Sequence, residues 1–293
     1  MSVEIQEQKI LAPYTTFKIG GPADYFVIVK TPEECVEALT FAHEKNIPFF
    51  ILGGGSDILI ADEGYRGLVI KNEMNTVNVD EERGVVTASA GVRLAQLIMQ
   101  SARAGLSGLE YAIGVPATVG GAVWANLGAR GSQMQDVVLS VEVVNTQTLE
   151  HKTLSNAECS FKYRDSIFKH EKWMILQVTF QLVKQPKAEV LARVQELTKL
   201  RKDTQDVGSF CAGCVFKNPT EQTDKAAAFL IDSLGLKGFQ IGGAQVSSIH
   251  ANFIINTGNA TAKDVIMLIS LIKQKVRDNL GVQLMEEIEY IGF

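Results

Sequence analysis

The chain has 293 residues, of which 46% are hydrophobic and 21% are charged, so it can bury a large core and has neither a disordered nor a fibrous composition. Its formal net charge of -5, with a pI near 5.5 and scattered basic residues, argues against nucleic acid as a partner. It contains no apolar run of about 18 residues or more, and residues 1–8 are polar and acidic, which predicts neither a membrane span nor a secretory signal. Four irregularly spaced cysteines fit a reducing compartment, so we expect a cytoplasmic protein.

The first part of the chain is predicted to form a β-α-β unit. Two apolar segments of strand length, 25–29 and 48–52, flank an amphipathic helix that extends to about Asn46. Thr31 caps this helix, Pro32 occupies its first position and Glu34 completes a capping box. A run of glycines follows the second strand directly, and further apolar segments lie at 58–60 and 67–70.

Residues 75–184 are predicted to be rich in strands. Short alternating segments at 77–79, 85–90, 139–144 and 173–182 surround one helix at 94–104. The region is therefore of the α+β kind.

After residue 184 the chain is predicted to enter a new unit. Pro186 ends the last strand, and an amphipathic helix at 188–202 would form the linker. Helices follow at 224–234 and 262–280, the second capped by Thr261 with Asp264 at its third position, and a terminal strand covers 282–291.

Several common sites are excluded by spacing. A dinucleotide fingerprint after the second strand would need glycine at position 58, which is Ile58, and no Gly-Lys pair is present for a phosphate-binding loop of the Walker type. No G-x-S-x-G nucleophile elbow occurs. The four histidines have no second His or Cys at ligand spacing, so we expect no metal site.

Two glycine-rich stretches could hold an anionic or flat ligand. Gly53, Gly54 and Gly55 are followed by Ser56 and Asp57, and such backbone can aim successive N–H groups at a phosphate. Alone, this loop could equally be a tight turn. A second stretch, residues 114–126, is also rich in small residues, and two such stretches favour a binding role.

Three other segments could carry chemistry. Arg164, beside Tyr163 and Asp165, could bind a carboxylate bidentately or form a structural ion pair. Cys211 and Cys214 have C-x-x-C spacing, but Pro219 prevents the helix that should follow a thioredoxin-like motif. Acidic residues of the terminal strand, Glu287 among them, would ordinarily be solvated edge charges.

Taken in order, these segments resemble one family, the UDP-N-acetylenolpyruvoylglucosamine reductases, over nearly the whole chain. Seven motifs carry the resemblance: residues 15–21 (TTFKIGG), 53–56 (GGGS), 108–126, 163–169 (YRDSIFK), 212–219 (AGCVFKNP), 241–246 (IGGAQV) and 287–292. The chain is similar to the shorter type of the family, because no long insertion lies between Phe168 and Arg201.

The resemblance implies an α+β protein with an FAD-binding fold of the p-cresol methylhydroxylase kind in two subdomains, followed by an α+β substrate-binding domain. The expected boundaries are 1–74, joined by the terminal strand 282–293, then 75–184, then 185–281. It further implies non-covalent FAD, NADPH as electron donor, and reduction of a UDP-sugar enol ether to UDP-N-acetylmuramate for peptidoglycan. Hydride would pass from flavin N5 to the vinyl carbon, and a proton would follow. We expect no nucleic acid partner and favour a monomer.

Site residues follow from the same resemblance. The catalytic residues would be Arg164 and Glu287 at the substrate carboxylate and Cys214 as the proton donor, where most members have serine. FAD would contact Gly53, Gly54, Gly55, Ser56, Asp57, Gly114, Val115, Pro116, Thr118, Gly120, Gly121 and Asn126. The substrate would contact Tyr163, Lys217, Asn218, Lys237 and His250.

The chain departs from the family pattern at Asp57, Ala117 and Arg130, where Asn, Gly and Tyr are usual. A related flavoprotein oxidase, a flavin-binding module without catalysis and a thiol regulator built on Cys211 and Cys214 remain as alternatives. An oxidase would need neither an acid at Cys214 nor a carboxylate clamp. A flavin-binding module would leave Arg164, Cys214 and Glu287 with structural roles.

Overall fold

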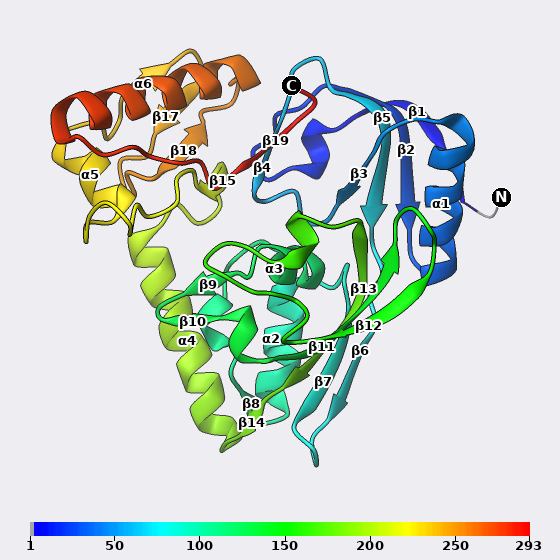
Figure 1. Cartoon of the computed structure of the whole chain (residues 1–293). Helices are drawn as coiled ribbons and strands as arrows, with labels where there is room; N and C mark the ends of the chain where they lie inside the picture. Colours follow the sequence, from blue (N-terminus) through cyan, green and yellow to red (C-terminus); the bar gives the residue numbers. More distant parts are fainter. Residues whose placement is uncertain (1–2) are drawn as a thin grey trace. The chain divides into compact units, whose positions relative to one another are not determined.

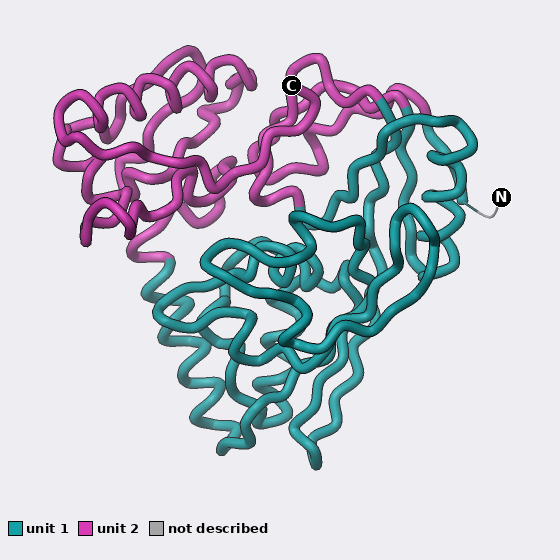
Figure 2. Tube along the Cα trace, viewed as in Figure 1, with its two compact units in different colours: residues 1–6, 25–54, 67–201 teal, residues 7–24, 55–66, 202–293 magenta. Residues whose placement is uncertain are grey.

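The computed structural model describes residues 3–293, and the chain divides into two compact units (Figures 1 and 2). Unit 1 comprises the described residues up to 6 together with 25–54 and 67–201, and unit 2 comprises 7–24, 55–66 and 202–293. Four elements run from one unit into the other: β1 (Gln6–Ile10), β2 (Pro22–Val29), β5 (Tyr65–Asn72) and α4 (Lys187–Thr204). No helix among residues 3–293 is both long and apolar enough to cross a membrane.

Unit 1 is built on an antiparallel sheet of five strands in the order β12-β11-β13-β7-β6. The helix α3 packs against β13 and β7, and one apolar core fills the unit. The strand β3 runs parallel to β5 and leads into the glycine-rich loop.

The helices of unit 1, besides α4, are α1 (Pro32–Lys45), α2 (Leu94–Arg103), α3 (Val119–Trp124) and the 3-10 turns η2 (Glu110–Ala112), η3 (Met134–Asp136) and η4 (Ile167–Lys169). Its strands are β3 (Phe49–Leu52), β6 (Val77–Asp80), β7 (Val85–Ser89), β8 (Leu106–Ser107), β9 (Gly128–Ala129), β10 (Ser132–Gln133), β11 (Val138–Asn145), β12 (His151–Ser155), β13 (Trp173–Gln181) and β14 (Val183–Lys184).

Unit 2 has a sheet of four strands in the order β15-β18-β17-β16 and a parallel pair of β4 with β19. Its elements are η1 (Ala12–Tyr14), β4 (Ile58–Ile60), β15 (Phe210–Cys214), α5 (Ala227–Ser233), β16 (Gln240–Ile241), β17 (Ala244–Val246), β18 (Phe253–Asn256), α6 (Ala262–Leu280) and β19 (Glu289–Ile291). Residues of α5, α6 and the sheet form a second apolar core.

Local signals explain the helices that match their predicted bounds. In α1, Thr31 accepts a hydrogen bond from Glu34 N, and Asn46 ends the helix in the left-handed conformation. The helix α6 begins with a capping box of Thr261 and Asp264 and ends at Gly281, where φ is 70°.

Two predicted elements differ from the structure. The helix expected at 224–234 begins only at Ala227, because Lys225 N donates to Thr223 Oγ1 in a turn and Ala227 N donates to Asn218 Oδ1. The terminal strand expected at 282–291 is much shorter in the structure. Only β19 pairs with another strand, β4. Before β19, Glu286 forms a single bridge with Phe216, so this segment changes partner along its length.

Candidate active site

The two glycine-rich stretches predicted to hold the flavin lie against each other in unit 1. A Cβ on Gly54 would lie 2.8 Å from the carbonyl oxygen of Pro116, and a Cβ on Gly53 would lie 2.6 Å from Thr118 Oγ1. Both contacts are too short for a real side chain. Gly54 is therefore required where the loop after β3 meets the backbone of Pro116, and a side chain at Gly53 would displace Thr118.

The turn after this contact is held by capping and by tight packing. Thr118 Oγ1 accepts from Gly121 N at the start of α3, and Gly120 N donates to Ala90 O at 2.8 Å. A Cβ on Gly120 would lie 2.8 Å from the Ala90 side chain. The contact with Ala90 explains why residue 120 is glycine, and the cap holds the predicted flavin residues Thr118, Gly120 and Gly121 on one turn.

Asn126 ties the second glycine-rich stretch to the segment that carries Arg164. It is buried, with φ at 43°, and its Nδ2 donates to Lys162 O at 2.8 Å and to Gln133 Oε1 at 3.0 Å. Its Oδ1 accepts from Gln135 N at 3.0 Å. These bonds give Asn126 a structural role, and a contact of its side chain with FAD stays a prediction.

Arg164 is held by its backbone and by its guanidinium. Its φ is 54°, in the left-handed region, and Nη1 donates to Gly128 O at 2.8 Å. The guanidinium lies 5.6 Å from the centre of the Tyr163 ring. Lys162 and Asp165 form a bridge across the turn, so the arginine is presented from a fixed loop.

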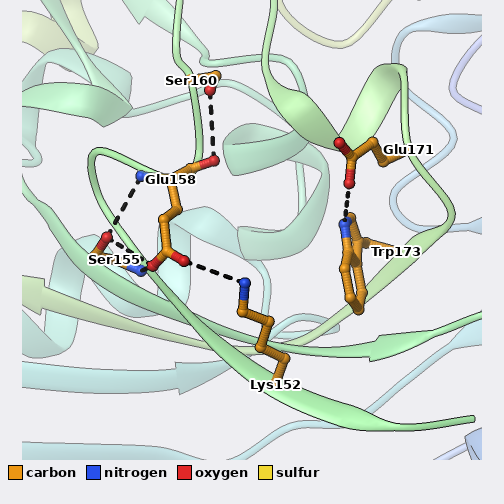
Figure 3. A network of polar contacts seen from close by, with 6 residues as sticks. All are labelled: Lys152, Ser155, Glu158, Ser160, Glu171 and Trp173. Atoms are coloured by element: carbon orange, nitrogen blue, oxygen red, sulfur yellow. Dashed lines mark hydrogen bonds and ion pairs between the residues drawn. The ribbon is translucent and has the colours of Figure 1, made fainter.

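A polar network fixes the chain just before this loop (Figure 3). Glu158 accepts hydrogen bonds from Ser155 N and Ser155 Oγ, both at 2.8 Å. It also forms an ion pair with Lys152 at 3.1 Å. These contacts, the backbone N–H of Ser155 first, lower the pKa of Glu158 to about 2. The network therefore anchors residues 155–160 while the carboxylate stays ionised.

The other half of the first glycine loop belongs to unit 2, where Thr16 holds it. Gly55 has φ at 63°, and a Cβ there would lie 2.2 Å from Tyr14 O, so only glycine fits. Thr16 N donates to Gly55 O at 2.9 Å, and Thr16 Oγ1 donates to Cys211 O at 2.7 Å. The motif at residues 15–21 thus fastens the loop to the strand that carries Cys214.

Two of the three predicted catalytic residues lie on neighbouring segments of unit 2. Glu287 N donates to Val215 O at 2.7 Å, directly after Cys214, and Lys217 N donates to Met285 O at 2.9 Å. Two residues beyond Glu287, Glu289 N donates to Asp57 O at 2.9 Å. One segment, residues 285–289, therefore runs beside both the Cys214 strand and the end of the glycine loop. Arg164 lies in unit 1, so its place beside this pair stays a prediction.

Asn252 is a structural residue beside the candidate site that the sequence did not reveal. It is buried, and its side chain holds both backbone groups of Phe216: Nδ2 donates to the carbonyl at 2.8 Å and Oδ1 accepts from the N–H at 2.9 Å. Val215 N donates to Asn252 O at 2.8 Å. Asn252 therefore holds the two residues that follow Cys214, the first of which, Val215, pairs with Glu287. Its only signal in the sequence is an amide at the edge of an apolar strand.

The predicted substrate residues have mixed local roles. Asn218 Oδ1 accepts from Ala227 N at 3.0 Å in the first turn of α5, and Lys237 pairs with Asp232 at 2.9 Å. The His250 ring lies 4.6 Å from the Phe253 ring. Lys217 is joined through its backbone to Met285, whereas Tyr163 lies in unit 1. Contacts of these residues with a substrate stay predictions. Among residues 3–293, no cluster of three or more His, Cys, Asp and Glu could hold a metal ion.

Comparison with known proteins gives the class and the family. Residues 23–152 match an FAD binding domain, and residues 205–291 match the C-terminal domain of UDP-N-acetylenolpyruvoylglucosamine reductase. The chain is thus an FAD-containing oxidoreductase.

Several relatives match nearly the whole chain. The reductase of Protochlamydia amoebophila is 43% identical over 293 residues, covering 99% of this chain and 95% of the relative. That of Carboxydothermus hydrogenoformans is 41% identical over 100% of this chain and 95% of the relative. The crystal structure of the enzyme from Thermus caldophilus matches with a TM-score of 0.81 at 37% identity and covers 99% of both chains. The chain belongs to the UDP-N-acetylenolpyruvoylglucosamine reductase family, and the predicted family, FAD-binding α+β fold and flavin cofactor are confirmed.

Proposed function

We propose that the protein catalyses the NADPH-dependent reduction of UDP-N-acetylenolpyruvoylglucosamine to UDP-N-acetylmuramate in peptidoglycan precursor synthesis. The observation that carries the proposal is the 2.7 Å hydrogen bond from Glu287 N to Val215 O. It fixes a thiol and a carboxyl group on neighbouring segments, the pair that hydride addition to an enol ether of pyruvate requires. FAD, when bound, supplies the hydride for the vinyl carbon.

Each catalytic residue then has one task. Addition at the vinyl carbon sends electrons into the substrate carboxylate, and Arg164 stabilises the charge that develops there through its planar fork. Glu287, protonated, donates a hydrogen bond to the same carboxylate. Cys214 Sγ gives its proton to the carbon beside the carboxylate, which completes the reduction.

The other assignments belong to the same proposal. We place the FAD pyrophosphate along Gly53 to Asp57 and the flavin ring near residues 114–126, where the backbones already approach within a side chain's width. Tyr163, Lys217, Asn218, Lys237 and His250 bind the UDP-sugar. The subdomains are 1–74 with 282–293, then 75–184, then 185–281, and the enzyme works as a monomer in the cytoplasm.

Anaerobic absorption spectroscopy tests the function. The purified protein should be yellow, lose its flavin absorbance with NADPH, and regain it when the enolpyruvyl UDP-sugar is added. An oxidase would recover its colour with oxygen but not with this substrate. A bleached flavin that the UDP-sugar does not reoxidise would contradict the proposal.

A further inference from the structure

The strand β15 contains a bulge between its two cysteines. In its pairing with β18, Cys211 lies opposite Ile255 and Cys214 lies opposite Phe253. Ala212 and Gly213 therefore share the space opposite the single residue Ile254. Gly213 has φ at 76°, in the left-handed region, where glycine is favoured in bulges.

The bulge puts both cysteines on one face of the sheet. In a regular strand, residues three apart point to opposite faces. Here the partners of Cys211 and Cys214 are two apart on β18, so the two thiols share the face of Phe253 and Ile255. Ala212 and Ile254, on the other face, are 3% and 1% exposed in the apolar core.

The bulge also brings the cysteines closer together. Three regular steps along a strand would separate their Cα atoms by about 10 Å, whereas two steps on the partner strand correspond to about 6.6 Å. Disulfides span Cα distances of about 4.4–6.8 Å. The estimated separation lies at the upper end of this range, so a bond requires the backbone to move between the two cysteines, and Gly213 gives the chain the freedom to do so.

We infer that Cys211 and Cys214 form a reversible disulfide when the enzyme meets a peroxide, and that this bond stops proton delivery. Cys214 as thiolate attacks one peroxide oxygen, the O–O bond breaks, and a sulfenic acid and hydroxide form. The thiolate of Cys211 then attacks Sγ of Cys214, the S–S bond forms and the S–O bond breaks, releasing hydroxide that takes up a proton as water. Two thiols and one peroxide give one disulfide and two waters, and a dithiol reverses the change.

The effect on activity rests on the proposed function, because a disulfide has no proton to give. Cys211 acts as the resolving thiol. Thr16 Oγ1 donates to the backbone carbonyl of Cys211, and a serine at this position keeps that carbonyl. Cys211→Ser should therefore preserve the strand.

The other two cysteines provide an internal control. Cys35 and Cys159 are buried, with no exposed surface, and desolvation raises the pKa of each thiol to about 12. They should therefore react with neither peroxide nor a maleimide while the protein is folded. Cys211 and Cys214 are both partly exposed.

The test treats the flavin-containing enzyme with hydrogen peroxide, blocks the remaining thiols with N-ethylmaleimide, and maps the cysteines by mass spectrometry after denaturation. We expect a peptide with Cys211 and Cys214 that lacks maleimide and two hydrogens, while Cys35 and Cys159 become labelled only after denaturation. Turnover should fall roughly 10² to 10⁴-fold, the usual contribution of a positioned acid, and return with dithiothreitol. Cys211→Ser should keep full turnover before oxidation and form no such peptide, and dimedone should trap Cys214.

The outcomes separate the thiol pair from the proposed function. If peroxide-treated enzyme gave no bridged peptide, the inferred disulfide between Cys211 and Cys214 would be wrong, even if Cys214→Ala is inactive. A bridged enzyme with full turnover would leave the pair standing and contradict the catalytic role of Cys214.

Discussion

At the scale of single residues, Arg164 combines an unusual backbone with a defined contact. Its φ of 54° and the 2.8 Å bond from Nη1 to Gly128 O leave the position of the guanidinium little freedom. A planar fork held in this way suits a carboxylate, which a single ammonium group cannot bind with two parallel hydrogen bonds.

Arg164→Lys should therefore keep the charge but lose the fork. We expect kcat for reduction of the UDP-sugar to fall by about 10² to 10³, the usual effect of losing one charge-stabilising donor, with flavin reduction by NADPH unchanged. Arg66→Lys is the matched control, because Arg66 pairs with Asp24 at the surface, at 2.9 Å with 69% of its side chain exposed. Steady-state kinetics that show equal activity for both variants would exclude the bidentate role.

At the scale of elements, Asn252 replaces a missing strand partner. Its amide pairs with both backbone groups of Phe216, so the chain stays hydrogen-bonded beyond the end of β15 at Cys214, where it meets the segment of Glu287. The two bonds from one side chain make this continuation depend on a single residue.

Asn252→Ala would leave two buried backbone groups without partners, each costing about 1–3 kcal/mol. The free energy of unfolding in urea should fall accordingly, and turnover should fall at temperatures where the variant is still folded, while NADPH still reduces the flavin. Asn145→Ala removes a similar side chain that accepts from Gln147 N and Thr148 N in an exposed turn, so it should leave turnover unchanged. Full turnover of folded Asn252→Ala would show that Asn252 does not position Cys214.

A second prediction at this scale concerns the network of Glu158 and the way the stability of the folded protein depends on pH. Its pKa in the folded protein is lowered from 4.5 to about 2, so its stabilisation is complete above pH 4.5 and is lost as the pH falls through 2. Glu158→Gln should unfold at a lower urea concentration than the wild type at pH 7. The difference between the two urea midpoints should disappear as the pH falls from 4.5 to 2.

Glu196→Gln is the control for this effect, since Glu196 makes one exposed ion pair with Arg193 at 2.7 Å. Its urea midpoint should stay close to that of the wild type at every pH. If the difference in urea midpoint between Glu158→Gln and the wild type stayed constant down to pH 2, it would contradict the assigned role of the carboxylate.

The sequence predicts the elements whose signals are local. The caps of α1 and α6 lie within a few residues of each helix, so their ends could be placed from the residues alone. The terminal segment could not, because alternation does not reveal that Glu286 pairs with Phe216 whereas β19 pairs with β4. The start of α5 depends on Asn218, which also acts from outside the helix.

At the scale of the whole molecule, the candidate site combines distant segments, and this limits what spacing can reveal. Only the family resemblance predicts that Cys214 and Glu287 act together, and the backbone bond from Glu287 N to Val215 O places their segments side by side. Asn252 escaped prediction because its partner, Phe216, is 36 residues away. The glycines could be predicted as loops, but only the contacts of Gly53 and Gly54 show that the two loops touch.

The central claim is that Cys214 supplies the proton after the flavin has been reduced. Stopped-flow absorbance of the flavin separates the two half-reactions in the wild type, Cys214→Ala and Cys214→Ser. Bleaching by NADPH should proceed at one rate in all three. Reoxidation by the UDP-sugar, with release of product, should be slower by roughly 10² to 10⁴ in Cys214→Ala and should stay close to the wild type in Cys214→Ser. Equal reoxidation and product formation in Cys214→Ala and the wild type would contradict the account.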